Sequence, residues 1–191
     1  MQDKKNKQKN EQKSSQKVAE FLEKNKIHKK DFAQMIGVTL SYVYNLIDEA
    51  IPFSTRSTTL ERVATVMDIA PEEFDEYVIS SDPVPYDKNL ESIKDYMKKN
   101  KLSTVEFLKK FERKKRLQIV DILRGAKPLF IDFSEFKKIG EILNIKDEEL
   151  FNLWKNVFVE HLEDNGFDEA VNRELLDAMF NGAKKYAVSK K

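Results

Sequence analysis

Apolar residues recur three and four positions apart along the first part of this chain, the spacing that places side chains on one face of an α-helix. Gly37 interrupts the pattern and suits the left-handed backbone of a helix end, and Thr39 follows as a candidate N-cap. Pro52 falls in a predicted loop, and Pro71 fits the first turn of a further helix. The five stripes are Val18, Phe21 and Leu22; Phe32, Ala33 and Ile36; Val43, Leu46 and Ile47; Leu60, Val63, Ala64 and Met67; and Phe74, Tyr77 and Val78. Residues 16–79 thus predict a unit of five short helices.

The same pattern occurs a second time. Residues 18–27 match residues 93–102 at an offset of 75, and residues 63–74 match residues 139–150 at an offset of 76. One inserted residue between the second and third helices explains the change of offset. Because two copies are too few for a solenoid, we expect two folded units, at 16–79 and 89–152. The proline-containing residues 80–88 between them predict a linker.

The two ends of the chain differ from the repeated units. Residues 1–15 are rich in lysine and poor in apolar side chains, which predicts a disordered basic arm, either a solubilising tail or a segment that follows phosphates. Residues 153–188 predict a helical hairpin broken at Asn165 and Gly166. Such a hairpin can pack on the second unit or pair with another chain, which would give a homodimer.

Composition agrees with an all-α fold and narrows the environment. Hydrophobic residues make up 40% of the chain and charged residues 35%, with only five glycines and five prolines. The absence of cysteine excludes disulfides and thiolate metal sites. No run of about 20 apolar residues and no apolar signal core is present, so we expect a cytoplasmic protein without a membrane partner. The net charge of +1 gives no argument for nucleic acid, but residues 98–116 hold nine basic residues.

Two short helices joined by a glycine-containing turn are typical of the helix-turn-helix, whose second helix enters the major groove. Residues 18–78 resemble the Cro/repressor-type family over its full five-helix length. The resemblance rests on residues 32–39, on Val43 and Leu46, and on residues 60–74. It implies an all-α protein with two tandem five-helix units of the lambda-repressor type, the second divergent, followed by the C-terminal hairpin.

By this resemblance, residues 39–48 form the recognition helix and bind double-stranded DNA. Asn45 is suited to paired hydrogen bonds with adenine, Ser41 to a base or a phosphate, and Leu40 to a thymine methyl group. Tyr42 and Tyr44 suit phosphates, bases and protein partners alike. The remaining DNA-binding residues implied for the first unit are Lys29, Thr39, Arg56 and Ser57.

The second unit departs from the family where Leu108 replaces a small residue and Glu112 replaces the turn glycine. The basic run Arg113, Lys114, Lys115 and Arg116 falls at the start of its third helix, where the helix dipole prefers anions. A phosphate backbone would relieve this conflict, so these four residues and Gln118 are further candidate DNA contacts. We expect Gln118 and Asp121 on the exposed side of this helix.

Two functions of different classes follow. The first is a sequence-specific DNA-binding transcriptional regulator. The second is a protein-interaction module, favoured by the lack of arginine and lysine in the predicted recognition helix. We expect no enzyme, no cofactor and no small-molecule ligand, because no catalytic motif is present. His28 and His161 lack partners at metal-ligand spacing, so we expect no metal site.

Overall fold

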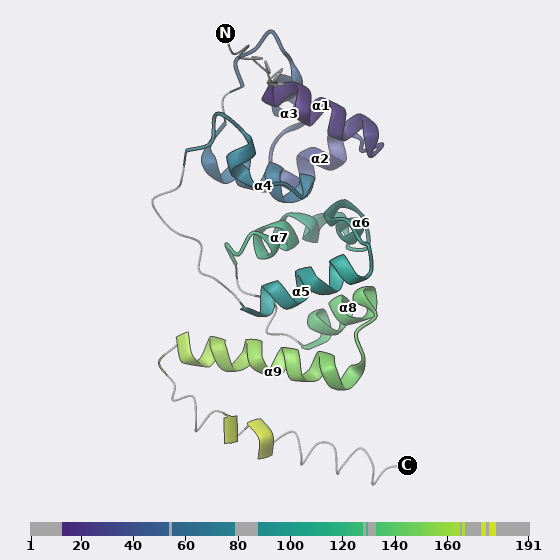
Figure 1. Ribbon diagram of the computed structural model, residues 1–191, viewed down its shortest axis with the longest axis vertical. Coiled ribbons are helices and arrows are strands. Elements are labelled where there is room, and N and C mark those ends of the chain that lie inside the picture. The colour runs from purple at the N-terminus through teal and green to yellow at the C-terminus, as the bar shows by residue number, and fades with distance from the viewer. Residues whose placement is uncertain are drawn as a thin grey trace, which may run out of the picture. The chain divides into compact units, whose positions relative to one another are not determined.

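Helices account for every regular element that the computed structural model describes (Figure 1). The structure describes residues 13–53, 55–78, 88–127, 129, 133–164, 166, 173–174 and 176–178. The helices are α1 (Ser14–Lys24), α2 (Lys29–Ile36), α3 (Leu40–Ile47), α4 (Ser57–Met67), the 3-10 helix η1 (Pro71–Glu73), α5 (Lys88–Lys99), α6 (Thr104–Lys109), α7 (Arg113–Leu123), α8 (Phe133–Leu143) and α9 (Asp147–Asp164). The predicted all-α class is therefore confirmed.

The chain divides into two compact units that do not follow the chain in a simple order. Of the described residues, the first unit takes those within 1–83 and 111–120, and the second takes those within 84–110 and 121–191. The division passes through α7, whose first eight residues belong to the first unit. Because the continuous helix α7 crosses the division between the two units, the division does not test the predicted domain boundaries, which stay a prediction.

The first unit is held together around α2 and α3. Helix α3 packs on α1 and α2, and α2 also packs on α4. The side chains that fill this core come from the predicted apolar stripes: Val18, Phe32, Ile36, Val43, Leu60, Val63, Ala64 and Phe74 are all essentially inaccessible to solvent. Gly37 ends α2 with φ 73°, and the Thr39 hydroxyl accepts a hydrogen bond from the Tyr42 N–H, as the pattern predicts for a helix end and an N-cap.

Helix bounds and helix ends recur at the offsets found in the sequence. Helix α4 becomes α8 at an offset of 76 at both ends, and α1 and α5 end 75 residues apart. Asn25 and Asn100 each donate a side-chain hydrogen bond to the carbonyl four residues earlier, at 2.9 and 2.8 Å. Lys26 and Lys101 follow with φ of 50° and 53°, and Asp68 and Asn144 with 56° and 53°. The two copies thus share their capping geometry as well as their hydrophobic spacing.

The copies differ at their third and fifth helices. Helix α3 begins at Leu40, whose counterpart at an offset of 76 is Arg116, yet α7 already begins at Arg113. The basic run therefore adds almost one turn to the start of α7. At the other end, the first copy has only the single turn η1, whereas the second continues through the 18-residue α9.

The predicted fifth helix of the first unit is thus wrong beyond its first turn. Phe74 is buried as expected, but Val78 is 72% exposed rather than facing inward. The chain leaves the helix after Glu73, and the Val78 carbonyl accepts a hydrogen bond from the Ser57 hydroxyl at 3.0 Å. This bond joins the segment after η1 to the start of α4.

The two termini also depart from the sequence boundaries. Ser14 and Ser15, placed in the disordered arm, lie buried in the first turn of α1, and the Ser14 hydroxyl donates to Glu76 Oε2 at 2.5 Å. Helix α9 runs through the boundary expected between residues 152 and 153. Lys155 on α9 pairs with Asp177, and residues 173–174 and 176–178 are helical. Residues 1–12, 80–87 and most of the second hairpin helix lie outside the described residues.

A close approach in the second unit gives a test of its packing. A Cβ added at Gly140 on α8 would lie 2.6 Å from Leu150 Cδ1 and 2.9 Å from its Cγ, and Leu150 is buried. Alanine in a helix is favoured over glycine by about 1 kcal/mol. Overpacking a filled core costs about 1–3 kcal/mol. We therefore expect Gly140→Ala to lower the free energy of unfolding, measured by urea denaturation, by about 1 kcal/mol net. Ser134→Ala on the exposed side of α8 is the control, and a gain of stability in Gly140→Ala would contradict this packing.

Candidate nucleic-acid interface

The burial of two side chains sets the orientation of α3. Val43 and Leu46 lie in the core at 0% and 4% exposure, and Ile47 is half-buried. The opposite side of the helix presents Leu40, Ser41, Tyr44 and Asn45, all exposed. Because α3 contains no charged residue, this outward side is polar and apolar but uncharged. The predicted DNA-reading residues Leu40, Ser41, Tyr44 and Asn45 therefore share one accessible surface.

Tyr42 differs from its neighbours because its hydroxyl connects α3 to the loop before α4. The Tyr42 Oη lies 2.6 Å from Thr55 Oγ1, and the side chain is half-buried. This contact holds the loop beside α3 and places Arg56, the exposed N-cap residue of α4, next to that helix. Ser57 uses its hydroxyl to bond to the Val78 carbonyl. Sequence reasoning did not find Thr55, because nothing local marks a residue as the partner of a distant tyrosine.

Lys29 lies on the other side of α3. Its ammonium group stands 4.9 Å from the centroid of the Tyr44 ring, within the range of a cation–π interaction. Lys29 begins α2, whose N-cap His28 makes no side-chain capping bond. The exposed side of α3 is therefore flanked by one cation from the start of α2 and by another from the start of α4.

The basic run of α7 is engaged by protein groups. Arg113 Nη2 lies 3.3 Å from Asp31 Oδ1, and Lys114 Nζ lies 3.1 Å from Glu112 Oε2. Arg116 donates from Nε to the Phe111 carbonyl at 3.3 Å. Lys114 is the most accessible of these charges, with a side chain 78% exposed, and Gln118 is also exposed. Carboxylates thus supply part of the negative charge that the start of α7 requires.

The side of α7 that corresponds to the outward side of α3 has a different chemistry. At an offset of 76, Ser41, Tyr44 and Asn45 correspond to Leu117, Val120 and Asp121. Leu117 is half-buried against the α2–α3 turn, where a Cβ added at Gly37 would lie 2.9 Å from both of its methyl groups. Val120 is fully buried. Asp121 is only 3% exposed, so the prediction that it lies on the exposed side is wrong, because its carboxylate pairs with Arg124 and Lys127.

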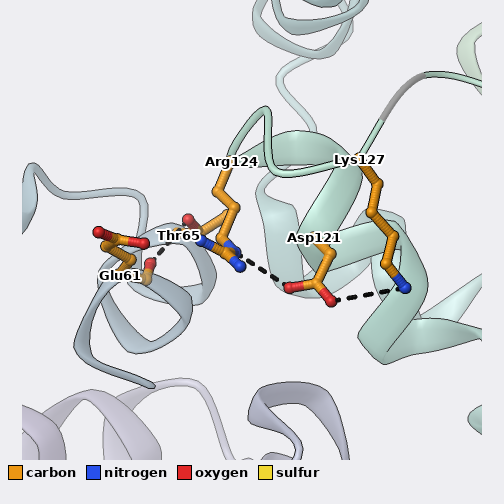
Figure 2. A network of polar contacts seen from close by, with 5 residues as sticks. All are labelled: Glu61, Thr65, Asp121, Arg124 and Lys127. Carbon is orange, nitrogen blue, oxygen red and sulfur yellow. Dashed lines mark hydrogen bonds and ion pairs between the residues drawn. The ribbon is translucent and has the colours of Figure 1, made fainter. Parts of the chain in front are cut away.

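Asp121 is held in an ion-pair network (Figure 2). Its carboxylate accepts a hydrogen bond from Arg124 Nε at 3.0 Å, and Lys127 Nζ lies 3.9 Å from the second oxygen. The Asp121 carbonyl accepts the N–H groups of Ala126 and Lys127 after the helix end at Gly125, which has φ 77°. Figure 2 also shows Thr65 on α4, whose hydroxyl donates to the Glu61 carbonyl at 2.8 Å. At the position where the first copy exposes the Asn45 amide, the second copy therefore has the buried Asp121, whose contacts stabilise the C-terminal end of α7.

Other kinds of site find little support in the described part of the chain. No group of three or more His, Asp or Glu side chains that could hold a metal ion occurs there. None of the helices described is long and apolar enough to cross a membrane. No protein-family model, no curated protein and no solved structure matches this chain. The resemblance to the Cro/repressor-type family therefore stays a prediction.

The contrast between Asn45 and Asp121 can be measured as stability. Removing the charge of one partner from a buried ion pair leaves the other uncompensated, and we expect Asp121→Asn to lower the free energy of unfolding by about 2–3 kcal/mol. Asn45→Asp makes the reverse exchange at the equivalent exposed position and should change stability by less than about 0.5 kcal/mol. Chemical denaturation of both variants checks this. Equal small effects would mean that Asp121 is not held as described.

Proposed function

We propose that this protein binds duplex DNA in a sequence-dependent way and acts as a transcriptional regulator, with α3 as the helix that enters the major groove. The observation that carries the proposal is the uncharged, exposed side of α3, which lies between Lys29 and Arg56. The first unit is then a helix-turn-helix of the Cro/repressor type, and the second unit is a divergent copy of it.

The chemistry of this surface divides the work between two kinds of contact. Asn45 offers the donor and acceptor pair that matches the edge of adenine, and Ser41 can reach a base or a phosphate. Lys29 and Arg56 supply the positive charge for phosphates on either side of the groove. The helix thus contributes selectivity, and its flanks contribute most of the electrostatic affinity.

The number of cations beside α3 limits the affinity for DNA that one copy can reach. Each neutralised phosphate contributes about 0.9 to the slope of log affinity against log salt, so Lys29 and Arg56 together give a slope of only about −1.8. A single reading helix with so few phosphate contacts binds weakly. A second chain on an adjacent half-site raises the affinity through effective concentration, which favours a homodimer on DNA. The C-terminal helices are the candidate dimer contact.

Helix α7, the counterpart of α3 in the second copy, contributes differently in this proposal. Since Leu117, Val120 and Asp121 are half-buried or buried, α7 does not present the side used by α3. Lys114 and Arg113 keep side chains 78% and 62% exposed, so they remain suited to phosphates. The basic start of α7 then adds affinity without adding sequence preference.

A second candidate function is a protein-interaction module, and the exposed side chains of Leu40 and Tyr44 favour it. They are 40% and 52% exposed, which is more than a purely polar reading surface requires. Selection of bound duplexes from a random pool at two salt concentrations separates the two functions. An enriched motif and a salt-dependent affinity support DNA binding, whereas no enrichment and no duplex binding support the interaction module.

Asn45→Ala tests the reading role of α3. The variant loses the paired hydrogen bonds to one base, and we expect a loss of about 1–3 kcal/mol on the selected site with little change on unrelated duplexes. Fluorescence anisotropy with both duplexes measures the difference. The control is Gln34→Ala, an exposed amide on α2. An Asn45→Ala variant with the parent's preference would rule out base reading by this residue.

Arg56→Ala tests the flanking charge. We expect weaker binding to all duplexes alike and a salt slope smaller in magnitude by about 0.9, because one phosphate contact is lost. Lys24→Ala removes an exposed charge from the end of α1 and serves as the control. A salt slope equal to that of the parent would show that Arg56 does not contact phosphate.

A further inference from the structure

An open groove lies beside the outward side of α3. Its apolar floor comes from α1, from the α1–α2 connection and from α3, and consists of Ala19, Leu22, Ile27, Leu40, Tyr44 and Ile47. The three α3 residues follow the spacing i, i+4, i+7, so they form one continuous stripe over two helical turns, about 10 Å long. Such a stripe gives the groove an apolar surface on which the apolar face of an amphipathic helix can pack.

The groove is strongly positive. Lys26, Lys29 and Lys30 line it together with His28, and the one acidic lining residue is Glu23. The start of α2 opens into the same groove, and its N–H groups receive no side-chain cap from His28. The positive end of the α2 dipole therefore adds to the lysine charges. Apolar contacts along the floor and cations at the rim complement a ligand that is apolar on one side and acidic on the other.

We infer that this groove binds an acidic amphipathic helical segment of a regulatory protein. The apolar side of the segment packs on Leu40, Tyr44 and Ile47, and its carboxylates pair with Lys26 and Lys30. Lys29, Leu40 and Tyr44 also belong to the surface proposed for DNA. The segment and the duplex therefore exclude each other, and the partner releases the protein from its site. This consequence rests on the proposed function, whereas docking of the segment does not.

The direct test uses the full chain and a fluorescein-labelled peptide of about 14 residues, with Leu and Phe at helical i, i+3, i+4 and i+7 positions and Glu elsewhere. We expect saturable binding with Kd of the order of 10 μM, weakened by salt. A control peptide has the same composition but no apolar face. Equal binding of both peptides, or no saturation by either, would overturn the inference.

Two variants locate the binding. Ala19→Phe fills the groove from α1 without a change of charge and should weaken peptide binding at least tenfold, whereas Glu20→Phe, one position along the same helix and outside the groove, should not. Lys30→Glu keeps the fold, because an acidic residue in the first turn of α2 suits the helix dipole, and should also weaken binding several-fold. Lys24→Glu is its matched control. Parent affinity in both Ala19→Phe and Lys30→Glu would refute the groove as the docking site.

Competition separates this inference from the proposed function. The peptide should raise the apparent Kd for a selected duplex, while Asn45→Ala should lose duplex affinity and keep peptide affinity, since Asn45 does not line the groove. Peptide binding without duplex binding would refute the DNA function alone. Duplex binding without peptide binding would refute the groove inference alone. If Ala19→Phe turned a dimer into a monomer and no peptide bound, the occupant would be a second copy of this chain, and the inference would fail.

Discussion

Burial of Val43 and Leu46 is the constraint on which the candidate surface depends. Side chains at helical positions i and i+3 lie on one side of α3, so fixing these two in the core fixes the direction of every other residue of that helix. The capping hydroxyl of Thr39 and the left-handed Gly37 determine where the helix starts. The polar chemistry of the outward side is therefore a consequence of apolar packing on the inward side.

The second copy shows that this framework does not by itself define a function. Helix ends, capping amides and left-handed residues recur at offsets of 75 and 76, so the same local rules act twice. Three substitutions on the outward side, at Leu117, Val120 and Asp121, turn an accessible surface into a packed one. A buried carboxylate is tolerated there because Arg124 and Lys127 compensate its charge. Divergence of one helix face is thus enough to separate two units with a common architecture.

The sequence predicted whatever depends on local spacing and failed where partners are distant in the chain. The stripes located the helices of the first unit, and the repeat located α4 and α8 at matching bounds, because periodicity and capping are local properties. The Val78 carbonyl is bonded to Ser57, and Arg113 pairs with Asp31, and both of these partners are distant in the chain. The start of α7 at Arg113 agrees with the prediction that the basic run begins this helix, since Arg113 to Lys115 are good helix formers. Matching Asn45 to Asp121 at the offset of 76 would have indicated that the two helices differ.

Charge decides how an uncharged helix such as α3 can take part in binding. A recognition helix rich in arginine would bind any duplex strongly, whereas in the proposed function α3 relies on Lys29 and Arg56 for attraction and on Ser41 and Asn45 for preference. Attraction between exposed charges is screened beyond about 8 Å at physiological salt, so a cation contributes only where it comes close to a phosphate. Lys29 is both one of these cations and part of the groove wall. If the proposed function holds, an anion that occupies the groove therefore removes part of the attraction for the duplex. In these proposals, binding of one ligand is thus coupled to the absence of the other through Lys29, Leu40 and Tyr44, which both surfaces share.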